Sequence, residues 1–177
     1  MKRFFVLTTL LACLVCNLTA SAESLYRGNV LDVIDAFKLV GNELGFSLWG
    51  TKYYTYKGIN RCELHFGNSQ NNLIRFRLNN DDSVARMLIT IPNSDNVLAL
   101  ESGMEAGILA VASCIAYGVN EKEAEHMWES FTVDVFDNIF SSHMHKKYYA
   151  WSSRTRQYIV MDVEWDMSKL DLYFYPE

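Results

Sequence analysis

Regular alternation between apolar and polar side chains constrains the fold of this chain more than any other feature. Ile74, Phe76 and Leu78 alternate with Arg75 and Arg77. Because successive side chains of a β-strand point to opposite faces, such a segment has one dry face and one wet face. Segments of this kind are typical of an antiparallel sheet that is covered on one side and connected by hairpins.

Similar segments lie on both sides of a central helical stretch, and each group follows a helix. The predicted strand segments are 49–56, 61–66, 74–78, 86–91, 147–151, 159–165 and 170–174, and the predicted helices are 29–44, 97–117 and 120–140. The sequence therefore predicts an α+β fold. Its antiparallel sheet has about six strands, helices pack on one face, and the order is α-βββ-αα-βββ.

The central helical stretch divides at Gly118, a residue that tolerates the left-handed backbone of a helix end. Asn120 and Glu123 have the spacing of a capping box at the start of the next helix. The first helix contains Gly103 and Gly107, four positions apart, which is the spacing of a membrane helix dimer. The uncharged run is too short to span a bilayer, so we expect a tightly packed core helix instead.

The first 22 residues have the features of an export signal. Lys2 and Arg3 precede an apolar run, and Ala20-Ser21-Ala22 places small residues where signal peptidase requires them. We therefore expect a signal peptide at 1–22, a single α+β domain at 23–177 and a secreted or periplasmic protein. The alternative is a lipoprotein that is anchored through Cys13.

Charge argues against one class of partner. The formal charge of the chain is −5, and loss of Lys2 and Arg3 leaves fourteen basic against twenty-one acidic residues, or −7. Beyond the signal segment, the largest basic run is Lys146-Lys147. Nucleic acid binding needs concentrated positive charge, so nucleic acid is not the expected partner.

Two cysteines, Cys62 and Cys114, follow the predicted signal segment. In an oxidising compartment such a pair can form one disulfide. The alternative is two reduced thiols that pack as small apolar groups. The sequence leaves both alternatives open.

Motifs of known enzyme chemistry are weak. His143 and His145 have the spacing of zinc ligands on a strand, but no third ligand is evident nearby, so neither a metal nor another cofactor is expected. Asp162 and Glu164 share the wet face of one predicted strand, as the carboxylates of a glycan or cell-wall hydrolase could. The plainer interpretation pairs them with Arg75, Arg77 or Arg86 on neighbouring strands.

The wet face of the sheet is the best candidate site, because tyrosine and arginine are enriched where proteins bind partners. Its candidate binding residues are Glu63, His65, Arg75, Arg77, Arg86, Tyr158, Asp162, Glu164 and Tyr173. The sequence favours an exported, non-enzymatic binding domain for a protein or peptide, with a glycan as second choice. A hydrolase and a self-associating structural protein, a homo-oligomer joined through its edge strands, are the alternatives.

Overall fold

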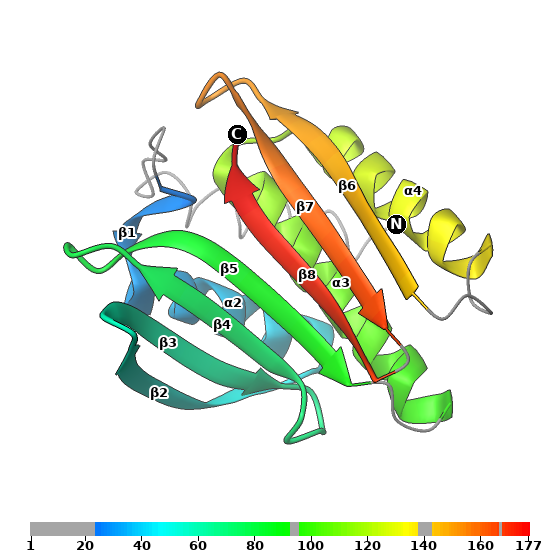
Figure 1. Cartoon of the computed structure of the whole chain (residues 1–177), viewed down its shortest axis with the longest axis horizontal. Coiled ribbons are helices and arrows are strands. Elements are labelled where there is room, and N and C mark those ends of the chain that lie inside the picture. Colours follow the sequence, from blue (N-terminus) through cyan, green and yellow to red (C-terminus); the bar gives the residue numbers. More distant parts are fainter. Residues whose placement is uncertain (1–23, 93–95, 138–142, 167) are drawn as a thin grey trace.

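In the computed structural model of the protein, the described residues are 24–92, 96–137, 143–166 and 168–177. They form one antiparallel sheet with helices on one side (Figure 1). In chain order the elements are β1 (Tyr26–Asn29), α2 (Val30–Leu44), β2 (Leu48–Tyr56), β3 (Ile59–Phe66), β4 (Leu73–Leu78), β5 (Ser83–Pro92), α3 (Asn96–Tyr117), α4 (Glu121–Asp137), β6 (His143–Ser152), β7 (Gln157–Asp166) and β8 (Lys169–Pro176). The predicted signal peptide lies outside the described residues.

The α+β fold with an antiparallel sheet and helices on one face is confirmed, but the expected number of strands is too low. The described residues form eight strands, in the order β2-β3-β4-β5-β8-β7-β6, with β1 paired to β5. The four alternating segments at 49–56, 61–66, 74–78 and 86–91 form a four-strand meander in the first half of the chain, which is one strand more than the order α-βββ-αα-βββ counts. This half also has β1, whose four residues are too short to show an alternating pattern.

The two halves of the chain meet at the pair β5–β8. Met87 lies opposite Phe174, and Ile89 lies opposite Leu172, in antiparallel register. This non-local pairing joins the meander β2–β5 to the meander β6–β8 in one continuous sheet (Figure 1). It also places the last strand of the chain in the middle of the sheet.

The helices cover the face to which the alternating apolar residues point. In Figure 1, α2 lies behind β3 and β4, α3 lies behind β8, and α4 lies alongside β6. Ile74 and Phe76 are fully buried beneath this helical layer, while Arg77 on the same strand is exposed. The apolar residues of the alternating pattern therefore lie on the buried face of the sheet, and the polar residues lie on the exposed face, as the sequence predicts. We call the helix-free side the outer face.

Caps end the helices where the sequence predicts. The Asn29 side chain accepts a hydrogen bond from the Leu31 backbone N–H at 2.9 Å, and Gly45 ends α2 with a φ of 87°. At α4 the Asn120 Oδ1 accepts from the Glu123 backbone N–H at 2.9 Å, and the Asn120 amide donates to the Glu123 carboxylate at 3.0 Å. Each bond satisfies a backbone group that the helix itself leaves unpaired.

Close packing explains the small residues of α3. A Cβ added at Gly107 would lie 2.6 Å from the indole of Trp128 on α4, whereas one added at Gly103 would meet nothing within 4 Å. Gly107 thus lets the Trp128 ring approach the α3 backbone, as expected for a core helix. Among the described residues, no helix is both long and apolar enough to cross a membrane.

The two cysteines are free. Cys62 on β3 and Cys114 on α3 are both fully buried. Burial raises the pKa of each thiol, because the charged thiolate loses its hydration. Of the two alternatives left open by the sequence, the structure has the pair of buried thiols and no disulfide between them.

Candidate functional site

All nine residues predicted to form a site lie on the outer face, spread over five strands. Glu63 and His65 are on β3, Arg75 and Arg77 on β4, Arg86 on β5, Tyr158, Asp162 and Glu164 on β7, and Tyr173 on β8. The strand register places some of them directly opposite one another and keeps others apart. The outer face has three groups of residues with different surroundings, and each group includes at least one of the nine.

The first group is a row of arginines across three neighbouring strands. Arg61 on β3 lies opposite Arg77 on β4, and Arg77 lies opposite Arg86 on β5. We call Arg61, Arg77 and Arg86 the arginine ladder. Among the described residues, no carboxylate lies within 4.0 Å of any of these three guanidinium groups. Like charges in directly opposed positions of a sheet are destabilising, so the ladder lowers the stability of the fold.

Aromatic rings lie at both ends of the ladder. The Arg61 guanidinium carbon is 4.9 Å from the centre of the Tyr56 ring, and that of Arg86 is 5.3 Å from the centre of the Tyr175 ring. Such cation–π contacts orient a guanidinium group without neutralising its charge. The Nε of Arg61 is also buried without a hydrogen-bond partner. The ladder therefore keeps hydrogen-bond donors that the described part of the protein does not use.

Arg75 differs from the ladder residues because it is neutralised. Its Nε lies 3.3 Å from the Glu63 carboxylate, which also accepts a hydrogen bond from the Tyr54 hydroxyl at 2.9 Å. Glu63 and Arg75 are direct cross-strand partners. This pair is an ordinary sheet ion pair, and it leaves Arg75 with less charge to offer a ligand.

The second group surrounds Asp162, which has partners on both neighbouring strands. It lies 2.8 Å from His145 Nε2 and 3.7 Å from Lys147 Nζ on β6, and accepts a hydrogen bond from the Tyr175 hydroxyl at 3.1 Å on β8. The predicted ion pairs of Asp162 and Glu164 with Arg75, Arg77 or Arg86 are wrong. Since β8 lies between β5 and β7, these carboxylates cannot be direct cross-strand partners of β4 or β5.

Near this group lies a buried carboxylate that the sequence analysis missed. Asp171 on β8 is 1% exposed, accepts a hydrogen bond from the Thr90 hydroxyl at 2.6 Å and pairs with Lys169. Burial, together with the charge of Asp171, raises the pKa of Tyr173. Tyr173 is thus partly enclosed rather than freely available to a partner.

The third group is a cluster of exposed aromatic rings on the β6–β7 hairpin. The ring centres of Tyr149 and Tyr158 are 6.1 Å apart, and those of Trp151 and Tyr158 are 5.0 Å apart, both with edge-to-face geometry. Their exposed fractions are 49%, 40% and 46% for Tyr149, Trp151 and Tyr158. We call these three residues the aromatic cluster. Apolar side chains exposed together in this way mark interaction surfaces more often than isolated ones do.

Tyr175 and Val160 connect the ladder to the aromatic cluster. Val160 lies opposite both Tyr175 on β8 and Tyr149 on β6, and Tyr175 contacts Arg86. Val160 is fully buried although it belongs to the outer face, so its neighbours on that face cover it. A continuous row therefore runs across the sheet, from guanidinium groups to aromatic rings.

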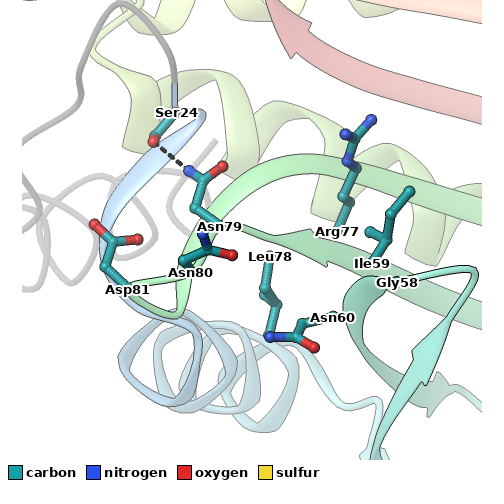
Figure 2. A pocket seen from close by; sticks show the side chains of 9 residues that line it. All are labelled: Ser24, Gly58, Ile59, Asn60, Arg77, Leu78, Asn79, Asn80 and Asp81. Carbon is teal, nitrogen blue, oxygen red and sulfur yellow. Dashed lines mark hydrogen bonds between the residues drawn. The ribbon is translucent and has the colours of Figure 1, made fainter.

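A shallow, open depression of about 590 Å³ lies beside Arg77, at the ends of β3 and β4. Figure 2 shows the side chains that line it, among them Arg77, Asn60 and Asn79. The Asn79 amide donates to the Ser24 hydroxyl at 2.7 Å, and the Asn60 carbonyl oxygen accepts from Thr55 at 3.0 Å. The Asn60 Nδ2 group and Arg77 can still donate to a bound group here.

His65 belongs to none of these groups. Its ring stacks on Trp49, with centres 4.5 Å apart, and the Trp49 indole N–H donates to the Gly67 carbonyl at 3.2 Å. His145 and its strand neighbour His143 are both exposed. Among the described residues, no group of three or more histidine, cysteine, aspartate or glutamate side chains could hold a metal ion.

Arg61, Tyr149 and Trp151 are among the residues of this face that the sequence-based site omits, as are Tyr175 and Asp171. Arg61, Tyr149 and Trp151 each stand next to a buried residue on the same strand. The alternation of apolar and polar residues in the sequence could therefore have placed them on the outer face. Comparison with known proteins adds no further residues. A scan of the chain against protein-family models found no match, and searches of curated proteins and of solved structures found none either.

Proposed function

We propose that this protein is a non-enzymatic binding domain that recognises a protein or peptide through its outer face. The observation that carries the proposal is the continuous row from the arginine ladder to the aromatic cluster, which combines unneutralised guanidinium groups with exposed rings. Arginine, tyrosine and tryptophan are enriched among the hot spots of protein interfaces, because each buries a large area and keeps a polar tip.

The hydrolase alternative receives no support from the surroundings of Asp162. His145, Lys147 and Tyr175 all contact this carboxylate, which is the arrangement of a structural ion-pair network. A glycan remains the second choice of ligand, because sugars also stack on exposed aromatic rings such as those of Trp151 and Tyr158. An array of soluble oligosaccharides tests that choice with the same variants as below.

Selection from an unbiased peptide library tests the proposal. The purified protein selects binders, and calorimetry then measures each peptide against the variants Arg77→Ala and Trp151→Ala. We expect each variant to lose about tenfold in affinity, or about 1.4 kcal/mol. The matched control is Lys122→Ala, an exposed residue of α4 in the helical layer, which should change affinity less than about twofold.

Two outcomes would overturn this function. One is a library that yields no binder to the wild-type protein. The other is a set of binders whose affinity is the same for Arg77→Ala, Trp151→Ala and Lys122→Ala. Thermal melting of each variant separates loss of binding from loss of fold, and the three exposed positions should leave the melting temperature close to that of the wild type.

We further propose that the protein acts outside the cytoplasm, on the basis of the export signal at 1–22. Expression of the full chain in a bacterium, followed by mass spectrometry of the mature protein, should find Glu23 at the N-terminus. An acylated N-terminus at Cys13 would instead support the lipoprotein alternative. Recovery of the intact chain with Met1 in the cytoplasm would contradict both.

A further inference from the structure

From the arrangement of the outer face, we propose that the ligand is an extended peptide segment with a short acidic run and, about six residues away, an aromatic or large apolar side chain. The acidic run lies on the arginine ladder and the apolar side chain on the aromatic cluster. This inference rests on the proposed function and specifies its ligand.

The arginine ladder requires an anion because the described part of the protein does not supply one. Arg77 is exposed and has arginines opposite it on both sides. A carboxylate placed between such guanidinium groups accepts two parallel N–H bonds, and it also removes the repulsion between the opposed cations. The binding of an acidic run therefore relieves an unfavourable interaction that the free protein retains.

The aromatic cluster completes the site on the other half of the sheet. Tyr149, Trp151 and Tyr158 hold one another edge to face, so their exposed surfaces are already ordered before a ligand arrives. An aromatic or large apolar side chain can pack against these rings at a small entropic cost. Tyr175 contacts Arg86 and lies opposite Val160, so the ladder and the aromatic cluster belong to one continuous surface. We therefore assign one ligand to both halves.

The sheet sets the distance between the two halves. From β4, which bears Arg77, to β6, which bears Tyr149, the strand order has four steps. Neighbouring strands lie about 4.8 Å apart, so the span is about 19 Å. An extended peptide rises about 3.3 Å per residue, so about six residues cover this span. The ligand therefore runs across the strands rather than along one of them.

Carboxylates on the same face disfavour a nucleic acid. Glu164 on β7 is exposed, and it lies between the strands of the ladder and β6. Glu63 and Asp162 lie on the same face, although each is paired with a basic side chain. A phosphate backbone crossing the sheet would meet these negative charges as well as the guanidinium groups. A peptide whose acidic residues are all at one end places its negative charges on the ladder and away from these carboxylates. We therefore favour a peptide over a nucleic acid.

Defined fluorescent peptides test the inference. The probe is a fluorescein-labelled peptide of three aspartates, a five-residue Gly-Ser spacer and one tryptophan. In the first comparison peptide, lysines replace the aspartates. In the second, glycine replaces the tryptophan, and in the third the spacer is absent. Fluorescence anisotropy with the purified mature protein should give the tightest binding for the probe, and at least tenfold weaker binding for each comparison peptide.

Protein variants then assign the two ends of the peptide. Arg77→Glu should weaken the probe at least tenfold and remove its preference for aspartate over lysine. Trp151→Ala should remove the preference for tryptophan over glycine and leave the preference for aspartate. Lys122→Glu is the matched control, because it makes the same change in net charge at an exposed position in the helical layer. It should change probe binding less than twofold at 150 mM salt.

Three results would overturn the inference. In the first, the probe fails to bind while library-selected neutral peptides bind and depend on Arg77, so the proposed function stands without an acidic ligand. In the second, a fluorescent oligo-uridylate binds more tightly than the probe and also depends on Arg77, so the partner is a nucleic acid. In the third, the probe binds equally to wild type, Arg77→Glu and Lys122→Glu, so the ladder plays no part.

Discussion

Arg77 on β4 lies directly opposite Arg86 on β5, and no carboxylate of the described residues is within salt-bridge distance of either. Because Arg61 lies opposite Arg77 on the other side, Arg77 has the least favourable electrostatic position of the three. Residues in unfavourable electrostatic positions lower the stability of a fold, and they are found most often at functional sites, where a ligand or partner binds.

The position of Arg77 leads to a prediction about stability. Arg77→Glu replaces a repulsive contact with attraction to Arg61 and Arg86, so the free energy of unfolding should rise by about 0.5 kcal/mol. Arg75→Glu is the contrasting variant, since it destroys the pair with Glu63 and should lower stability by a similar amount. Urea unfolding measures both, and a destabilised Arg77→Glu would show that the ladder is not repulsive.

The contact of Gly107 with Trp128 leads to a second prediction. Gly107→Ala places a methyl group where the Trp128 indole lies, so the protein should lose about 1–3 kcal/mol of stability from overpacking. Gly103→Ala, four residues earlier on the same helix, meets no atom within 4 Å and should gain up to about 1 kcal/mol from helix propensity. Equal effects of the two variants in thermal melts would contradict this packing.

The third prediction concerns Asp134, whose carboxylate joins α4 to β6. Hydrogen bonds from Lys146 at 2.6 Å and from Tyr148 at 2.8 Å lower the pKa of Asp134 below its usual 3.8. A group with a lowered pKa stabilises the fold above its unfolded pKa, and this stabilisation is lost as the pH falls through the folded pKa.

Asp134→Asn should therefore be less stable than the wild type at neutral pH, and the difference should shrink below about pH 4. Urea unfolding between pH 2 and pH 7 measures this effect. It should be modest, because the pair is partly exposed. Glu129→Gln, which changes an exposed carboxylate on the same helix, is the control and should change the free energy of unfolding at neutral pH less than Asp134→Asn does.

The fourth prediction concerns the buried thiols. In the native protein Cys62 and Cys114 should resist a thiol-reactive probe, because both are buried and burial raises the pKa of each. Both should react fully in denaturant without prior reduction, and mass spectrometry of labelled peptides measures this. A peptide pair that contains Cys62 joined to Cys114 would contradict the free thiols.

Local patterns predicted a large part of this architecture. Alternation around Ile74 and Phe76 identified the dry face, since the direction of a side chain on a strand depends only on its position along that strand. Asn120 marked the start of α4 for a similarly local reason, because a cap bonds to groups within a few residues of itself.

The partners of the outer-face residues could not be predicted in the same way. Asp162 was expected near the arginines of β4 and β5, and its contacts are instead His145, Lys147 and Tyr175. Its actual partners depend on the insertion of β8 between β5 and β7, which joins segments about 80 residues apart. Alternation shows which face a residue occupies, but it carries no information on which strand lies beside it.

The sequence by itself determined the α+β class, the direction of each alternating side chain and the boundary between α3 and α4, because these depend on interactions over a few residues. Only the tertiary structure decided that Arg61, Arg77 and Arg86 form one ladder and that Tyr175 and Val160 connect it to the aromatic cluster. The physical reason is that strand order and register are set by the burial of the whole apolar face at once.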